Sequence, residues 1–271
     1  MASLRVIARN FTEKVLKMNQ WALVTGATAG IGESFTRLLA SQRYNIVLVA
    51  RDENRLLERA FHLREKYGVE TRVIRADLST ADGMTEVETF LHENKVDVLI
   101  NNAGFGLNKA FTHSDIHDET AMLDVLVKAP MRFTHIVLPQ MKARNSGTVI
   151  NVSSVAGFIA GGTYSASKSY LTVFSESLHT ELRGTNVHVT ALCPGFTRTE
   201  FHERGKMKMT GLPNFAWLSA DQLVADAWRD SQDGCAVSVP GRLYKALLIL
   251  IRILPRSIVR RVGMGIRKKQ R

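Results

Sequence analysis

Short apolar runs alternate with amphipathic segments through most of the chain. Most runs are rich in valine, isoleucine and leucine and are bounded by glycine or polar residues, as buried β-strands are. The segments between them repeat apolar residues at helical spacing, as in 33–40. This alternation predicts parallel βαβ units. The expected strands are 21–25, 45–50, 71–75, 96–100, 147–152 and 187–192.

Length and composition fit one globular α/β domain. The chain has 271 residues, of which 45% are hydrophobic, so it can bury a large core. No internal repeat, low-complexity tract or linker interrupts the pattern. We expect a folded domain over 21–240, an N-terminal amphipathic segment over 1–20 and a C-terminal extension over 241–271.

Tyr164 and Lys168 stand four residues apart in a segment of helical pattern, so they share one helix face. A phenol loses its proton near pH ~10 in water, and a fixed cation nearby favours the phenolate. The pair therefore predicts a tyrosine acting as acid or base. Taken alone, the same spacing also fits a solvated helix face.

A glycine-rich turn follows the first expected strand. Gly26, Gly30 and Gly32 are spaced G-x-x-x-G-x-G and precede the helical pattern of 33–40. Such a turn lets backbone N–H groups approach a pyrophosphate, and the helix N-terminus adds partial positive charge. By itself it could also be a tight turn without a ligand.

Three further motifs occur in a fixed order after this turn. They are Asn101-Asn102-Ala103-Gly104, Ser153-Ser154 ahead of Tyr164, and Pro194-Gly195. With them the chain resembles the short-chain dehydrogenase/reductase family over 21–199. The resemblance implies a Rossmann-like, doubly wound parallel sheet flanked by helices, and hydride transfer between a nicotinamide and a carbonyl or alcohol carbon.

The resemblance also implies roles for individual residues. Tyr164 would be the general acid, Lys168 would lower its pKa and hold the nicotinamide ribose, and Ser154 would bind the carbonyl oxygen. Ser153 is the competing serine. Asp77 and Leu78 would flank the adenine, although Asp77 also suits a turn or a cap. The rest of the expected cofactor groove is Gly26, Thr28, Ala29, Gly30, Ile31, Gly32, Asn102, Ala103, Gly104, Pro194, Gly195, Phe196, Thr197 and Thr199. Of these, Phe196, Thr197 and Thr199 match positions that meet the nicotinamide carboxamide.

The end of the second expected strand indicates which dinucleotide is used. An NAD site usually has an acid there, but this chain has Ala50 followed by Arg51. A guanidinium suits a 2′-phosphate, so NADP(H) is expected. The alternative is that Arg51 only pairs with Asp52 or Glu53.

The chain departs from the family pattern in two places. Ser154 precedes Tyr164 by only ten residues, a spacing that a trimmed loop can absorb. Leu126 stands where many members have an asparagine that anchors a proton-relay water, and Asp124 lies on a different helix face. Either the relay is rebuilt, or turnover is slow, or the protein is a cofactor-binding scaffold without catalysis.

The net charge of +11 lies at the two ends of the chain. Residues 241–271 hold ten Lys/Arg and no acid, whereas 21–240 hold 22 Lys/Arg against 24 Asp/Glu. No nucleic-acid motif is visible, so a nucleic-acid partner is not expected. The apolar stretch 243–254 is too short to span a bilayer and predicts an interfacial anchor. The alternative is a helix packed on the protein itself or in a subunit interface.

The remaining expectations concern partners and location. Residues 1–20 suggest a second surface-lying helix. The histidines form no metal-binding cluster, so no metal is predicted. Two cysteines do not make a disulfide framework, which fits a cytoplasmic protein. The extension 241–271 adds an expected peripheral contact with a membrane surface. The basic apolar tail suggests a small hydrophobic, lipid-like substrate. The family resemblance implies a homo-oligomer.

Overall fold

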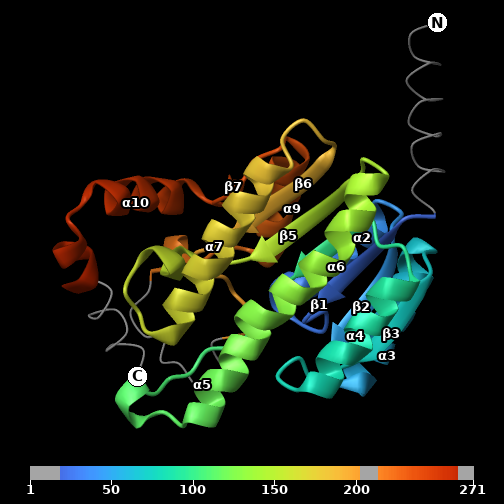
Figure 1. The fold of residues 1–271 in the computed structure, drawn as a ribbon, viewed down its shortest axis with the longest axis horizontal. Helices are drawn as coiled ribbons and strands as arrows, with labels where there is room; N and C mark the ends of the chain where they lie inside the picture. Colours follow the sequence, from blue (N-terminus) through green and yellow to red (C-terminus); the bar gives the residue numbers. More distant parts are fainter. Residues whose placement is uncertain (1–18, 202–212, 262–271) are drawn as a thin grey trace, which may run out of the picture.

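The computed structural model describes residues 19–201 and 213–261. Their centre is a parallel seven-stranded sheet in the order β3-β2-β1-β4-β5-β6-β7 (Figure 1). The expected Rossmann-like, doubly wound architecture is confirmed. The strands are β1 (Trp21–Thr25), β2 (Asn45–Ala50), β3 (Thr71–Arg75), β4 (Val98–Asn101), β5 (Gly147–Val152), β6 (Val187–Leu192) and β7 (Val237–Ser238).

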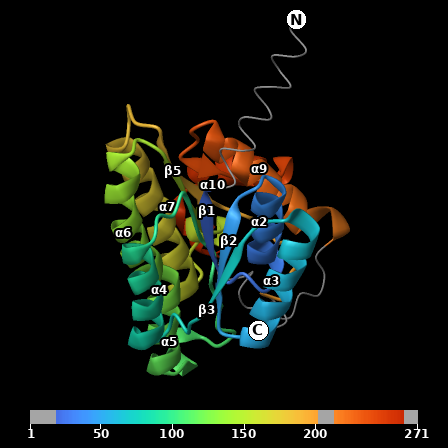
Figure 2. The same ribbon diagram turned by 90° about the vertical axis from the view of Figure 1, so that its right-hand side faces the viewer.

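Helices cover both faces of the sheet (Figure 2). One layer holds α2 (Gly30–Ser41), α3 (Glu53–Tyr67) and α9 (Ala220–Gln232). The other holds α4 (Ala81–Glu93), α6 (Ala129–Ala143) and α7 (Thr163–Glu181). A sheet covered on both faces needs strands that are apolar throughout, which explains the continuous runs in the sequence.

Successive side chains of a strand point into different hydrophobic cores, one on each face of the sheet. Ala22 and Val24 pack with α2, α3 and α9, whereas Leu23 between them packs with α4, α6 and α7. All three side chains are fully buried. Burial on both faces fixes the register of the central strand, because a slip by one residue would exchange the two sets of contacts.

Two further helices matter for the site. α5 (Ile116–Leu123) continues through a π-helical turn, Asp124–Lys128, directly into α6. α10 (Arg242–Ile253) follows the edge strand β7 (Figure 1). Among the described residues, no helix combines the length and apolar character needed to cross a bilayer.

The strand predictions are confirmed, with two differences. The fourth strand is Val98–Asn101 rather than 96–100; just ahead of it, the Asp97 carboxylate accepts the Trp21 N–H at 3.0 Å. β7 was not expected from the sequence, since it has only two residues. The predicted helix over residues 1–20 falls mainly outside the described residues, as does the basic end 262–271.

Candidate active site

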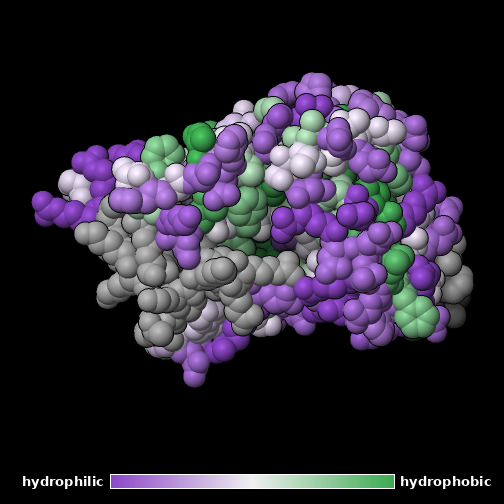
Figure 3. Space-filling view, turned by 90° about the horizontal axis from the view of Figure 1, so that it is seen from below, coloured by the Kyte–Doolittle hydropathy of each residue, from purple (hydrophilic) through white to green (hydrophobic). Residues whose placement is uncertain are grey.

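The carboxyl ends of the parallel strands bring the motif residues to one edge of the sheet. The glycine turn follows β1, Arg51 follows β2, Asn102 follows β4 and Ser154 follows β5. β1 and β4 are neighbours although β2 and β3 lie between them in sequence, so the strand order reverses at this point. Ligands bind at such a switch point in open α/β sheets. Figure 3 views the molecule from below Figure 1 and shows apolar residues in a hollow near the centre of that face.

The glycine turn is shaped so that only glycine fits at its key positions. Gly26 has φ +65° and Gly30 has φ +57°, both in the left-handed region. A Cβ at Gly32 would lie 2.2 Å from the Gly26 carbonyl oxygen. α2 begins at Gly30, and the side chain of its N-cap residue, Ala29, makes no capping hydrogen bond. The first-turn N–H groups of α2 therefore suit the phosphate oxygens of a dinucleotide.

Asn102 and Ala103 link the two loops on either side of the switch point. The Thr25 Oγ1 accepts the N–H groups of Asn102, at 2.9 Å, and of Ala103, at 3.0 Å. The Asn102 side-chain amide donates to the carbonyl oxygens of Thr25, at 2.8 Å, and Gly26, at 3.2 Å. These bonds hold the β4 loop against the glycine turn, so the walls of the expected groove are already formed.

The two candidate serines have different surroundings. Ser153 is 2% exposed, and its hydroxyl bonds to the Lys168 carbonyl oxygen at 2.6 Å and to Thr172 Oγ1 at 2.8 Å. Ser154 is only partly buried, and its hydroxyl accepts the Ala156 N–H at 3.1 Å and bonds to the Tyr164 side chain. The geometry thus favours Ser154 as the serine that can reach a carbonyl oxygen.

Tyr164 and Lys168 lie together at the start of α7, as the spacing predicts. The Lys168 Nζ is 5.8 Å from the centre of the Tyr164 ring. It donates a hydrogen bond to the Val152 carbonyl oxygen at 2.5 Å, at the end of β5, and the side chain is 4% exposed. The phenol, the ammonium and the Ser154 hydroxyl therefore form one cluster at the carboxyl edge.

The pKa of Tyr164 differs from the expectation that Lys168 lowers it. Burial raises the pKa of the Tyr164 phenol to about 12, and the hydrogen bond with Ser154 opposes this only in part. Burial likewise lowers the pKa of Lys168 to about 8, although the nearby Cys193 acts in the opposite direction. The structure thus holds a protonated phenol beside a lysine that is charged at neutral pH.

Leu126 lies beside this cluster. It is fully buried in the π-helical turn, and its Cδ2 is 2.7 Å from where a Cβ would stand on Gly104. That same point is 3.9 Å from the Lys168 Nζ. Asp124 pairs with Lys128 at 3.2 Å. The side of the site expected to carry a relay asparagine is therefore apolar, and Asp124 does not replace it.

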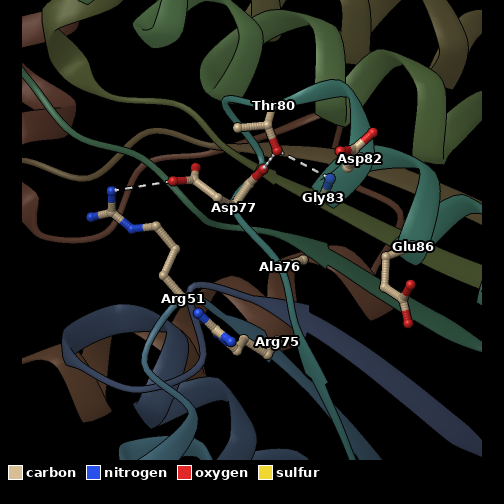
Figure 4. Close-up of a pocket in the computed structure, with 8 residues that line it drawn as sticks. All are labelled: Arg51, Arg75, Ala76, Asp77, Thr80, Asp82, Gly83 and Glu86. Carbon is tan, nitrogen blue, oxygen red and sulfur yellow. Dashed lines mark hydrogen bonds and ion pairs between the residues drawn. The ribbon is translucent and has the colours of Figure 1, made fainter.

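A cavity of about 380 Å³ lies beyond the ends of β2 and β3 (Figure 4). Arg51 and Asp77 face each other across it, with 3.8 Å between a guanidinium nitrogen and a carboxylate oxygen. Leu78 instead packs in the core. The residues that line the cavity are Arg51, Arg75, Ala76, Asp77, Thr80, Asp82, Gly83 and Glu86.

The ion pair of Arg51 differs from the alternative that the sequence left open, a pairing with Asp52 or Glu53. The Asp52 carboxylate caps α3 by accepting the Arg55 N–H at 3.1 Å, and Arg51 forms an ion pair with Asp77. Burial would raise the pKa of Asp77, but hydrogen bonds from Ser79 and the nearby Arg51 lower it below its ordinary value. Asp77 is thus an anion that holds Arg51 at the cavity.

Sequence reasoning missed Arg75 as a second guanidinium at this cavity. It is the last residue of β3, and the ladder sets it directly beside Ala50 of β2. Figure 4 shows its side chain on the same side of the cavity as Arg51. The available signal was its place at the carboxyl end of an expected strand next to the strand that carries Arg51.

The turn after β6 closes the site from the other side. The Thr199 side chain packs on Gly30, where a Cβ would lie 2.8 Å away. Thr197 is buried, and its hydroxyl donates to the Gly195 carbonyl oxygen at 3.0 Å. The ring of Phe201 lies 5.9 Å from the Tyr164 ring, centre to centre. This turn therefore reaches from the glycine turn to Tyr164.

The chain is similar to known proteins. A model of the short chain dehydrogenase family matches residues 20–209. Very-long-chain 3-oxoacyl-CoA reductase of Rattus norvegicus is 31% identical over 263 residues, which cover 94% of this chain and 82% of that protein. This chain is a short-chain dehydrogenase. As such it is an oxidoreductase that acts on carbonyl or CH–OH groups.

Solved short-chain dehydrogenases share the fold over most of their length. One from Sphingobium yanoikuyae, in complex with NADPH, has a TM-score of 0.78 and 29% identity and covers 87% of this chain and 96% of that one. A 7beta-hydroxysteroid dehydrogenase has a TM-score of 0.82 and 26% identity and covers 91% of this chain and 97% of that one. The site described above thus belongs to a family fold that holds nicotinamide cofactors.

Proposed function

We propose that this short-chain dehydrogenase uses NADPH to reduce the carbonyl group of a hydrophobic, lipid-like substrate. The cofactor would lie along the expected groove, from the cavity beside Arg51 over the glycine turn to Lys168. When bound, it supplies the hydride. The chain's own residues hold the carbonyl oxygen and provide the proton.

The observation that carries this proposal is the protonated phenol of Tyr164 beside the Ser154 hydroxyl. With a pKa of about 12, the phenol keeps its proton at neutral pH. A carbonyl oxygen placed between the two hydroxyls accepts a hydrogen bond from each, and these bonds strengthen as negative charge develops. Tyr164 thus holds the proton that the product alcohol needs.

Lys168 has a holding role in this proposal. Its ammonium is buried and already donates to the Val152 carbonyl oxygen, so the side chain is fixed in direction. The remaining N–H groups can bind ribose hydroxyls. Its charge also favours negative charge developing on Tyr164 when the proton leaves.

The cavity beside Arg51 supports NADPH rather than NADH. β2 ends in Ala50, which offers no acid to the adenosine ribose. Arg51 and Arg75 bring two guanidinium groups to the place where a 2′-phosphate would lie. The solved Sphingobium yanoikuyae relative, which holds NADPH, supports the same choice.

The relatives indicate the substrate class. The rat relative is named a very-long-chain 3-oxoacyl-CoA reductase, and proteins of the same name from Homo sapiens and Mus musculus are each 29% identical. We infer that this chain also reduces a long-chain 3-oxoacyl thioester.

The outer face of α10 supports peripheral contact with a membrane surface. Leu247, Ile249, Leu250 and Ile253 are 40 to 76% exposed on this helix. Residues 241–271 carry ten Lys/Arg and no acid. An exposed apolar stripe together with uncompensated positive charge suits an interface with anionic lipids.

Vesicle binding tests the membrane part separately from the chemistry. The full chain should co-sediment with anionic phosphatidylserine vesicles, and a double variant, Ile249→Gln with Ile253→Gln, should do so much less. Leu57→Gln is the matched control, because Leu57 is similarly exposed (52%) but lies on α3. A full chain that ignores these vesicles contradicts membrane contact and leaves the reductase proposal intact.

Leu126 motivates one alternative, a cofactor-binding scaffold with weak or no catalysis. Its side chain puts an apolar wall beside Lys168, where many family members have a relay asparagine. Consumption of NADPH separates the two candidates. The reductase should oxidise NADPH with long-chain 3-oxoacyl-CoA but not with the matching saturated acyl-CoA, and kcat/KM should rise with chain length. Binding of NADPH without consumption selects the scaffold.

A further inference from the structure

α10 turns two side chains inward, toward the active site. Tyr244 and Leu248, one helical turn apart, are each 4% exposed, whereas the neighbours Leu243 and Leu247 are 47% and 40% exposed. Gly241, with φ +88°, sits at the N-cap position of the helix. α10 is thus fixed to the catalytic domain by its first turns while its other face points outward.

Tyr244 binds the backbone of the turn after β6. Its hydroxyl accepts the Phe196 N–H at 3.0 Å and donates to the Ala216 carbonyl oxygen at 2.6 Å. Its ring lies flat against Gly195: a Cβ there would be 2.0 Å from the Tyr244 Cζ. The absence of a side chain at Gly195 is therefore what lets this tyrosine reach Phe196.

The same turn is also held from a second direction. The Leu218 N–H donates to the Phe196 carbonyl oxygen at 2.8 Å, and the Arg198 N–H donates to the Leu218 carbonyl oxygen at 3.1 Å. The peptide groups on both sides of Phe196 are therefore fixed, one by Tyr244 and one by Leu218. Leu218 belongs to the segment ahead of α9, whereas Tyr244 comes from the C-terminal extension.

α10 also touches the loop between Ser154 and Tyr164. The Arg252 guanidinium lies 5.8 Å from the centre of the Phe158 ring, which belongs to the 3-10 turn directly after Ser154. The helix thus contacts both segments beside the carbonyl site, the turn after β6 and the loop of the catalytic serine. Side chains of the C-terminal extension can therefore hold the backbone beside the expected nicotinamide site.

We propose that Tyr244 is a positioning residue that holds the turn Gly195–Thr197 against the nicotinamide half of the cofactor. This inference rests on the proposed function, because that turn is expected to meet the nicotinamide carboxamide. In this role Tyr244 acts through the backbone of the turn and not by binding the cofactor or the substrate itself. It acts by fixing the Phe196 N–H and by packing on Gly195, so the C-terminal extension forms part of the active site.

Tyr244→Phe tests this role, because it keeps the ring on Gly195 and removes only the hydroxyl. Two ligands are compared by calorimetry: NADPH, and 2′,5′-ADP, which has the adenosine half without the nicotinamide. The Kd for NADPH should rise about threefold to tenfold, the scale of one hydrogen bond. The Kd for 2′,5′-ADP should stay within about twofold. kcat should fall as well, since a displaced nicotinamide reacts more slowly.

Tyr67→Phe is the matched control. Tyr67 ends α3, at the opposite edge of the sheet from the turn, and this variant should leave both Kd values unchanged. Equal weakening of both ligands in Tyr244→Phe would show a general effect on the fold and overturn the proposal. An unchanged Kd for NADPH together with an unchanged kcat would overturn it too. If the unmodified protein binds neither ligand, the proposed function itself fails, and this inference fails with it.

Discussion

Arg55 joins two loops of the site. One of its partners, Glu200, lies 145 residues away in the sequence. Its guanidinium binds both carboxylate oxygens of Glu200, at 3.0 and 2.8 Å, and the carbonyl oxygen of Thr28 at 3.1 Å. The hydrogen bond to Glu200 is the main cause that raises the pKa of Arg55. Thr28 belongs to the glycine turn and Glu200 to the segment after β6. Arg55→Gln should therefore loosen both at once.

The expected magnitude follows from the geometry and the exposure. A two-pronged guanidinium–carboxylate pair is among the stronger ion pairs, with hydrogen bonds to charged groups of about 1.5–3 kcal/mol. The side chains of Arg55 and Glu200 are 28% and 44% exposed, so solvent screens the pair. Fully exposed pairs contribute only about 0.2–1 kcal/mol. We expect Arg55→Gln to lower the free energy of unfolding by about 1–2 kcal/mol.

A double-mutant cycle isolates the pair from the other contacts of each side chain. Urea unfolding is measured for the unmodified protein, Arg55→Gln, Glu200→Gln and the double variant. The coupling energy should be about 1 kcal/mol, and Arg55→Lys should recover only part of it, because a lysine cannot bind both oxygens in parallel. A coupling energy below about 0.3 kcal/mol, within the usual error of additivity, would refute the reasoning.

Three further predictions concern cofactor binding, Lys168 and Leu126. Arg51→Ala and Arg75→Ala should each raise the Kd for NADPH by about tenfold, one lost charge-assisted contact, and leave the Kd for NADH unchanged; equal losses for both would remove these residues from 2′-phosphate recognition. Because the Lys168 ammonium, with a pKa of about 8, is lost as pH rises, NADPH affinity should fall through that pH, and Lys168→Gln should abolish this dependence; titration calorimetry between pH 6 and 10 checks it. Leu126→Asn should raise kcat for a 3-oxoacyl-CoA while lowering Tm, because it adds a relay group but buries a polar amide; a stable variant with unchanged kcat would show that no relay is missing.

The sheet could be predicted from the sequence because its signal is local. Continuous apolar runs bounded by polar or glycine residues determine strands buried on both faces, and five of the six expected strands have the observed bounds. β4 begins two residues later than expected, and Asp97 ahead of it binds the Trp21 N–H, a contact between residues far apart in sequence that a local pattern does not show. β7 has two residues, too few to produce a pattern.

The motif residues of the site could also be predicted, since each follows a strand and parallel strands end at one edge. Their energetics could not. The spacing of Tyr164 and Lys168 places them together, but burial, which no spacing reveals, dominates the pKa of the phenol. In the same way, helical periodicity predicts α10 but not that Tyr244 packs on Gly195. That contact needs the three-dimensional approach of two distant segments.

The Tyr164→Phe variant tests the central claim most directly. It keeps the ring and removes the proton that the site would donate, so NADPH should bind as it does to the unmodified protein. With NADPH and a long-chain 3-oxoacyl-CoA, the unmodified protein should oxidise the cofactor, which is followed by the loss of NADPH absorbance. The variant should lose nearly all of that activity. Turnover by the variant close to that of the unmodified protein would contradict the account.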